Sequence, residues 1–118
     1  MDYPPAAMAA VIASFGEFWP FYLRQHSRPL TRGLHYLGTG GAILATAAAL
    51  ATGRLLFLTL LPVLGYGFAW AAHFFVERNR PATFTYPLWS LAADFLMFAK
   101  MLRGQMGDEV QRAGLTQK

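Results

Sequence analysis

Two long apolar stretches constrain this chain more than any other feature of its sequence. They run over residues 34–52 and 55–75, and the second contains no ionisable side chain before His73. Each approaches the length of about 20 residues that a helix needs to cross the roughly 30 Å hydrocarbon core of a membrane. Because only Gly53 and Arg54 separate them, the two stretches are expected to form a tight antiparallel hairpin with two membrane spans.

The composition agrees with a membrane protein and excludes several other classes. Charged residues make up 14% of the 118 residues and hydrophobic residues 55%, whereas ordinary soluble domains carry about 25% charged residues. This length allows one domain, residues 1–118. The net charge of +4 comes from thinly spread basic residues, which suit an anionic membrane surface better than a nucleic acid. The absence of cysteine excludes disulfides, thiolate metal sites and cysteine nucleophiles.

Further helical segments flank the hairpin. Residues 6–18 are mostly apolar and lead into an aromatic cluster of Phe18, Trp19, Phe21 and Tyr22, which predicts an interfacial helix or, as the alternative, an ordinary packed helix. Residues 86–101 contain Pro87 and Asp94, so a half-buried helix on the hairpin is expected there rather than a third span.

The predicted fold class is therefore all-α, a small integral membrane helical bundle. It consists of the two-span antiparallel hairpin, an N-terminal interfacial helix and a C-terminal half-buried helix, with loosely ordered tails at residues 1–5 and 104–118. Basic residues flank the open end of the hairpin, and only Arg54 lies at its turn. The positive-inside tendency then predicts that both termini are cytoplasmic.

Three histidines belong to that same end of the hairpin. His35 is in the opening turn of the first stretch and His73 is near the end of the second, so an antiparallel arrangement places them at similar depth, and His26 lies in the polar segment just before. Neutral imidazole suits iron, zinc, copper and nickel, and three imidazoles with open coordination positions describe a catalytic metal site. A headgroup or cap contact is the alternative for each histidine taken alone.

Two acids lie in apolar surroundings near these histidines. Glu77 follows His73 by four residues on a helix face shared with Tyr66 and Trp70. Ionisable groups at membrane depth are expensive and tend to mark function or a buried partner. Asp94 is expected to accept the second ring N–H of a ligand imidazole and so fix its tautomer. For Glu77 the roles of metal ligand, of such an acceptor and of an ion-pair partner stay open.

The chain resembles the small membrane-protein family that includes the fungal 2-hydroxy fatty acid dioxygenase of phytosphingosine breakdown, and most strongly its bacterial members. The resemblance spans about residues 15–102, and it is carried by Phe18-Trp19-Pro20-Phe21-Tyr22-Leu23, His26, Pro29, Arg32, His35, Gly38-Thr39, Gly65-Tyr66, Ala69-Trp70, His73-Phe74, Glu77, Asn79, Pro81-Ala82-Thr83-Phe84, Pro87, Ser90-Leu91 and Asp94.

This resemblance implies an Fe(II)-dependent dioxygenase in a bacterial inner membrane. Its substrates would be O2 and a long-chain 2-hydroxy fatty acid, and its products the fatty acid one carbon shorter and CO2. Carried over by position, His26, His35 and His73 would be the iron ligands. Membrane lipids are the expected surroundings, and a homo-oligomer stays open.

A substrate of this kind needs a site for its carboxylate and one for its chain. Arg28, Arg32 and Arg80 are candidates for the carboxylate, because a planar guanidinium binds it bidentately; contact with lipid headgroups is their alternative. Tyr66 and Trp70 are expected to line an acyl groove between the spans, with plain aromatic packing as the alternative.

Two other functions fit the same residues. Zn(II) at the three histidines would suit a membrane lipid hydrolase. A non-enzymatic module that binds anionic lipids would need no metal, because its histidines and arginines would only contact headgroups.

Overall fold

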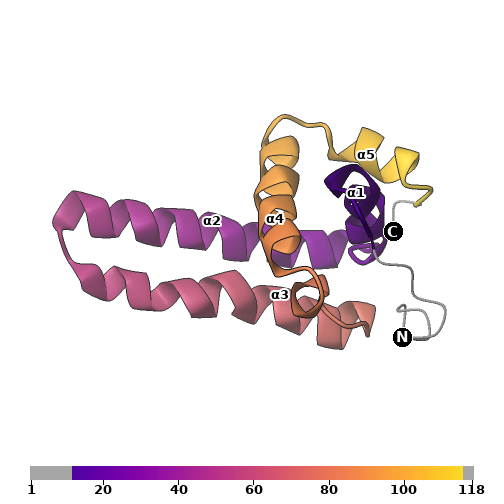
Figure 1. Ribbon diagram of the computed structural model, residues 1–118. Coiled ribbons are helices and arrows are strands. Elements are labelled where there is room, and N and C mark those ends of the chain that lie inside the picture. The colour runs from indigo at the N-terminus through magenta and orange to yellow at the C-terminus, as the bar shows by residue number, and fades with distance from the viewer. Residues whose placement is uncertain (1–11, 116–118) are drawn as a thin grey trace.

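The computed structural model describes residues 12–115, and every regular element in that range is helical (Figure 1). In chain order the elements are α1 (Phe15–Arg24), α2 (Pro29–Thr52), η2 (Leu55–Leu60), η3 (Val63–Gly67), α3 (Phe68–Ala71), η4 (Ala72–Glu77), η5 (Ala82–Phe84), α4 (Pro87–Leu102) and α5 (Met106–Arg112). The all-α prediction is confirmed. The tail expected at residues 1–5 lies outside the described residues.

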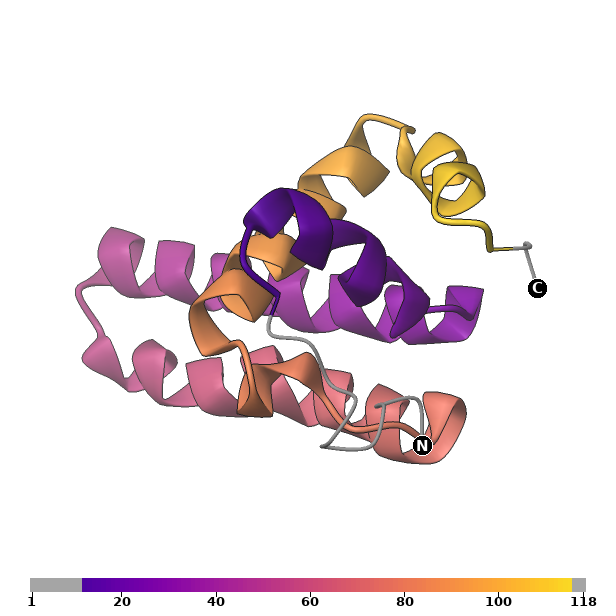
Figure 2. The same cartoon turned by 45° about the vertical axis from the view of Figure 1, so that its right-hand side comes forward.

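The longest elements are two helical segments that lie side by side and run in opposite directions (Figures 1 and 2). One is α2, and the other is the run of η2, η3, α3 and η4 over residues 55–77, which has wide π-type turns in η3 and η4. The connection is tight because Gly53 adopts the left-handed conformation, with φ of 70°, and its N–H donates to the carbonyl of Ala49. We call this pair the long helices.

Both long helices have the length and composition of membrane spans. The mean hydropathy of their most apolar windows is 1.3 for Pro29–Thr52 and 1.8 for Leu55–Glu77. Only 22% and 11% of these windows are buried inside the protein, so most of their apolar side chains face outward. Leu50 is 83% exposed and Phe75 80% exposed.

Small residues let the backbones of the long helices approach closely. A Cβ atom at Gly38 would collide with the carbonyl oxygen of Leu64 on the facing η3 turn. Ala45 and Ala49 on α2 and Ala69 on α3 are also buried. Such small-residue contacts are the usual way in which helices pack in lipid.

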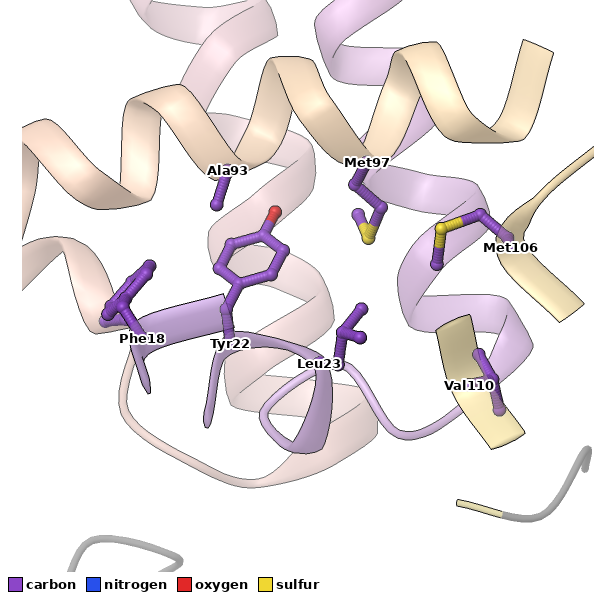
Figure 3. Packing of buried hydrophobic residues seen from close by; sticks show 8 residues of the cluster. Phe18, Tyr22, Leu23, Ala93, Met97, Met106 and Val110 are labelled. Atoms are coloured by element: carbon purple, nitrogen blue, oxygen red, sulfur yellow. The ribbon is translucent and has the colours of Figure 1, made fainter. Parts of the chain in front are cut away.

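The remaining helices cover the end of the long helices that lies away from the Gly53 turn. α4 runs steeply across the pair, and α1 and α5 lie on the same side (Figures 1 and 2). Their shared core contains Phe18, Tyr22 and Leu23 from α1, Ala93 and Met97 from α4, and Met106 and Val110 from α5 (Figure 3). The part of the pair near the turn protrudes from this packed end (Figure 1).

The first helix is capped at its N-terminus and packed into the covered end. Ser14 caps it, since its Oγ accepts a hydrogen bond from the Glu17 N–H at 3.2 Å, and the helix continues to Arg24. The aromatic side chains of Phe18 and Tyr22 are fully buried against α4 and form part of the core of the covered end. The packing agrees with the packed-helix alternative, and an interfacial position of this helix stays a prediction.

The C-terminal segment also differs from the expectation of a loose tail at 104–118. Residues 106–112 form α5, and Met106 and Val110 are buried in the core. The carboxylate of Glu109 accepts hydrogen bonds from the Trp19 indole at 2.7 Å and the Lys100 ammonium at 3.1 Å. These contacts fix α5 on α1 and α4, whereas residues 116–118 lie outside the described part of the chain.

Candidate metal centre

Three segments that are distant in sequence each place one imidazole at the same point. His26 follows α1, His35 lies near the start of α2, and His73 lies in the wide turn of η4. All three side chains are buried. The structure thus brings together the residues that the sequence predicts to converge.

The coordinating atoms of these rings are close. Nε2 of His26 lies 3.0 Å from Nε2 of His35 and 3.1 Å from Nε2 of His73. One ligand atom from each of the three rings lies within 4.8 Å of the others. The rings stand nearly perpendicular to one another, with interplanar angles of 75–86°, so their edges rather than their faces meet.

An oxygen that can only accept a hydrogen bond lies beside the second nitrogen of each ring. Nδ1 of His26 is 2.6 Å from the Tyr22 carbonyl, and Nδ1 of His73 is 2.7 Å from Asn79 Oδ1. Nδ1 of His35 is 3.5 Å from a carboxylate oxygen of Asp94. For His26 and His73, a neutral ring in this setting holds its proton on Nδ1, so their Nε2 lone pairs are available to a metal ion.

Nitrogen lone pairs that point at one another repel, whereas a cation between them can bind each of them. Two nitrogens that each lie about 2.1 Å from one metal ion, at right angles around it, are about 3.0 Å apart. The spacings of 3.0 and 3.1 Å from His26 Nε2 to the Nε2 atoms of His35 and His73 match this value, and the three ligand atoms all lie within 4.8 Å of one another. The donor set therefore fits a divalent metal, and three imidazoles with open positions fit iron or zinc.

Burial favours the form of His26 that binds metal. It lowers the pKa of His26 well below the ordinary value, and the neighbouring imidazoles of His35 and His73 lower that pKa further. The ring consequently stays neutral at pH 7, as a metal ligand must.

Asn79 is a functional candidate that the sequence reasoning missed. Its Oδ1 accepts from His73, its Nδ2 donates to the Gln25 carbonyl at 3.1 Å, and its own backbone N–H donates to the His73 carbonyl at 2.9 Å. It thereby ties the η4 histidine to the segment that carries His26. In the sequence it is a polar residue between two arginines, and only its place among the residues that carry the family resemblance singles it out.

Asp94 lies where the prediction requires it, beside a histidine. Its Oδ1 also accepts a hydrogen bond from the Tyr22 hydroxyl. Burial, followed by the charge of Asp94, raises the pKa of Tyr22 well above the ordinary value, so the phenol remains a donor. At 3.5 Å, the separation from His35 Nδ1 is longer than an ordinary N–H···O hydrogen bond. The role of fixing a tautomer stays a prediction.

The contacts of Glu77 differ from the roles left open for it, which were metal ligand, acceptor for an imidazole N–H and ion-pair partner. Its carboxylate accepts from the Ser27 hydroxyl at 2.6 Å, the Arg28 N–H at 2.8 Å and the Thr31 hydroxyl at 2.5 Å. Within the described residues, the group of possible metal ligands contains the three histidines and not Glu77. The carboxylate instead fastens the start of α2 to the end of η4.

The three arginines proposed for the substrate carboxylate lie elsewhere. Arg32 is buried and its Nη1 donates to the His26 carbonyl at 2.8 Å. Arg28 is exposed, and the exposed Arg80 guanidinium lies 5.7 Å from the centre of the Phe84 ring. None of them is among the described residues that line the cavity at the histidines, so this geometry does not support the expected role.

A small cavity of about 10 Å³ adjoins the imidazoles, and a larger apolar groove of about 650 Å³ begins beside it. Gly65, Tyr66 and Asp94 line both. The groove runs between the long helices and α4 toward the turn, where its wall includes Leu50 and Leu61. Tyr66 borders both the groove and the cavity, and Trp70 lines the cavity; their role in binding an acyl chain stays a prediction.

The comparisons with known proteins agree with this site. A family model described as 2-hydroxy-palmitic acid dioxygenase Mpo1-like matches residues 12–106, which include all three histidines, Asn79 and Asp94. The chain belongs to this Mpo1-like family. No curated protein and no solved structure matches the chain. The resemblance seen in the sequence is thereby confirmed, and the assignment of the histidines as iron ligands stays a prediction.

Proposed function

We propose that this protein is an Fe(II)-dependent dioxygenase in a membrane. It would convert a long-chain 2-hydroxy fatty acid and O2 to the fatty acid one carbon shorter, CO2 and water. The observation that carries the proposal is the convergence of three Nε2 atoms beside an apolar groove, in a chain of the Mpo1-like family. The reaction balances without another reductant, because the cleaved C–C bond and the oxidised carbinol carbon together supply the four electrons that O2 takes up.

The histidines of the candidate metal centre would hold the ion. A ferrous ion supplies one-electron chemistry toward O2 and Lewis-acid contact with substrate oxygens. The Tyr22 carbonyl and Asn79 Oδ1 keep the ring protons of His26 and His73 on Nδ1, which leaves Nε2 as a ligand. Burial of all three rings excludes bulk water from this end of the site.

The groove would hold the acyl chain. Its volume of about 650 Å³ lies in the range of about 300–1,000 Å³ that is typical of small-molecule sites. Because Asp94 and Tyr66 line both groove and cavity, a chain in the groove presents its carboxyl end to the histidines. Burial is worth about 0.8 kcal/mol per CH2 group only relative to water, so a substrate that comes from lipid must be selected mainly at its head.

The long helices would be the two spans of a membrane hairpin. Both pass the length and hydropathy limits of a span, and most of their apolar side chains are exposed, unlike those of a core helix in a soluble protein. Exposed Arg24, Arg28, Arg78 and Arg80 lie at the covered end, and Arg54 lies at the turn. The positive-inside tendency then places the covered end and both termini in the cytoplasm.

The proposal is tested by metal analysis and product analysis on the whole protein. We expect protein purified without oxygen to contain stoichiometric iron, and mass spectrometry to find pentadecanoic acid after addition of 2-hydroxypalmitic acid, Fe(II) and air. His73→Ala should lose both signals and still insert into membranes, because His73 provides a ligand but little apolar surface. Arg54→Ala, at the far turn, is the control and should keep both.

Other results would contradict the proposal in distinct ways. Stoichiometric zinc without pentadecanoic acid would favour a lipid hydrolase at the same histidines. Metal at background level in wild type and His73→Ala alike would favour a lipid-binding module.

A further inference from the structure

Two residues that line the cavity at the histidines each carry a buried polar atom without a hydrogen-bond partner. The atoms are Nε1 of Trp70, on α3, and Oγ of Ser90, on α4. Both residues line that cavity together with His26, His35 and His73. The Ser90 side chain is only 3% exposed, so solvent at the surface does not satisfy it.

Leaving such atoms unpaired costs free energy, and here both belong to residues that line the same cavity. A buried donor or acceptor without a partner costs about 1–3 kcal/mol, and most buried polar groups in native proteins are paired. The third such atom among the described residues, Oε1 of Gln25, belongs to a residue that does not line the cavity. The pair of unpartnered groups thus coincides with the site where a substrate head must lie.

The chemistry of the two groups specifies the ligand that they accept. An indole N–H only donates, and a serine hydroxyl donates readily to an anion. The complementary ligand therefore offers acceptor oxygens, and a carboxylate forms stronger bonds to such donors than a neutral group does. A cavity of about 10 Å³ has room for about one oxygen-sized group, and the adjoining groove takes the rest of the molecule.

We propose that the Trp70 indole N–H and the Ser90 hydroxyl hold the carboxylate of the 2-hydroxy acid. This inference rests on the proposed function and adds the residues that select an acid. It assigns to neutral donors from two helices the role that the sequence suggested for arginines. The charge of the carboxylate would be balanced by the metal at the neighbouring histidines rather than by a guanidinium.

Binding without turnover tests this assignment. Without oxygen, the affinity of the iron-loaded protein in detergent is measured for 2-hydroxypalmitic acid and for 1,2-hexadecanediol, which replaces the carboxylate by CH2OH. Wild type should prefer the acid. Trp70→Phe and Ser90→Ala should each weaken binding of the acid by about 10- to 100-fold, as expected for a lost hydrogen bond to a charged group. They should weaken binding of the diol much less, because its neutral hydroxyl accepts weaker hydrogen bonds, and leave the iron content unchanged.

Matched controls separate this role from packing. Trp70→Phe keeps the ring contacts with Tyr66 and Phe84, whose centroids both lie 5.4 Å from the indole. Thr46→Val removes a groove hydroxyl that already donates to the Ala42 carbonyl of its own helix, so it should not change the preference for the acid. Trp89→Phe, a tryptophan outside the cavity lining, should not change it either.

Several outcomes would overturn the assignment. Equal weakening of acid and diol would show that the side chains only shape the cavity. Unchanged acid binding in both variants would show that their donors serve a bridging water, and a wild type that does not prefer the acid would exclude carboxylate recognition. Preferential binding of the acid by a wild-type protein that forms no pentadecanoic acid would contradict the proposed function and not this assignment. In active protein, the two variants should raise KM more than they lower kcat.

Discussion

At the scale of single residues, the candidate metal centre depends on acceptors behind the imidazoles as much as on the imidazoles. For His26 the acceptor is the main-chain carbonyl of Tyr22, which no side-chain substitution removes. For His73 it is the side chain of Asn79. Partners of this kind orient ligands and tune their basicity, so Asn79 is the position where this effect can be measured.

We predict that Asn79→Ala lowers metal affinity by about 10- to 100-fold, the usual effect of losing such a partner. The His73 ring would lose the oxygen that fixes its tautomer, although its Nε2 would remain. The measurement is the rate and extent of metal loss to a chelator. Asn79→Asp keeps an acceptor oxygen at the same position and should restore much of the affinity; equal loss in both variants would contradict the role of the acceptor.

The sequence was sufficient to predict which histidines meet, and insufficient to predict what orients them. His35 and His73 come to one depth because an antiparallel hairpin with a two-residue connection fixes their register. Asn79 reaches His73 only because the chain turns sharply at Arg78, a residue with positive φ of 58°. Neither residue type nor spacing predicts that turn. The sequence likewise does not predict that Trp70 and Ser90 line the cavity with unpaired polar atoms.

At the scale of elements, the contact between α2 and η3 sets the distance between the histidine-bearing helices. Gly38 lies one turn after His35, and its missing side chain allows the Leu64 carbonyl to approach. The facing helix has wide turns in η3 and η4, which advance the chain differently from an α-helix. Tyr66, Trp70 and His73 of the face predicted from regular spacing still line one cavity, whereas the Glu77 carboxylate is held by Ser27, Arg28 and Thr31.

We predict that Gly38→Ala destabilises the protein by about 1–3 kcal/mol, the usual cost of overpacking, and also weakens metal binding. The added methyl group would push α2 away from η3 and separate His35 from His73. Thermal unfolding in detergent and metal titration measure the two effects.

Gly33→Ala provides the matched control in the same helix. No atom lies within 4 Å of a Cβ placed at Gly33, and alanine is favoured over glycine inside a helix by up to about 1 kcal/mol. It should leave metal binding unchanged and stability equal or higher. A Gly38→Ala protein that behaves like Gly33→Ala would contradict the close-contact argument.

At the scale of the whole molecule, the buried carboxylate of Glu109 links α1, α4 and α5 at the covered end. Glu109 of α5 accepts from Trp19 of α1, from Lys100 of α4 and from Arg112 at 3.0 Å. The hydrogen bond from Trp19 is the largest cause that lowers the pKa of Glu109 below its ordinary value, and Lys100 and Arg112 add to it. The composition of the polar C-terminal segment suggested a loose tail, because its anchor is a set of contacts to distant residues.

We predict that acid destabilises the covered end through Glu109. A carboxyl with a lowered pKa in the folded protein contributes stability above its unfolded pKa, near 4.3, and loses it as the pH falls through the lower folded value. Melting temperatures should therefore fall between about pH 5 and pH 3. Glu109→Gln should lose about 1–3 kcal/mol at pH 7 and show a flatter profile.

The control for this experiment is Asp108→Asn, which changes an exposed carboxylate in the same helix. It should retain the acid sensitivity of wild type. An unchanged profile in Glu109→Gln would assign the acid response to another group.

The apolar groove opens sideways, because Ile43, Leu50 and Leu91 belong both to its wall and to the exposed surface of the protein. For a hairpin that stands in a bilayer, this opening faces the tails of neighbouring lipids. Under the proposed function, a hydroxy acid would enter the groove from the leaflet in which it lies, and its shortened product would return there, without either crossing water. The proportion of hydroxy acid among the surrounding lipids, rather than its amount in the aqueous phase, would then set how often the groove is occupied.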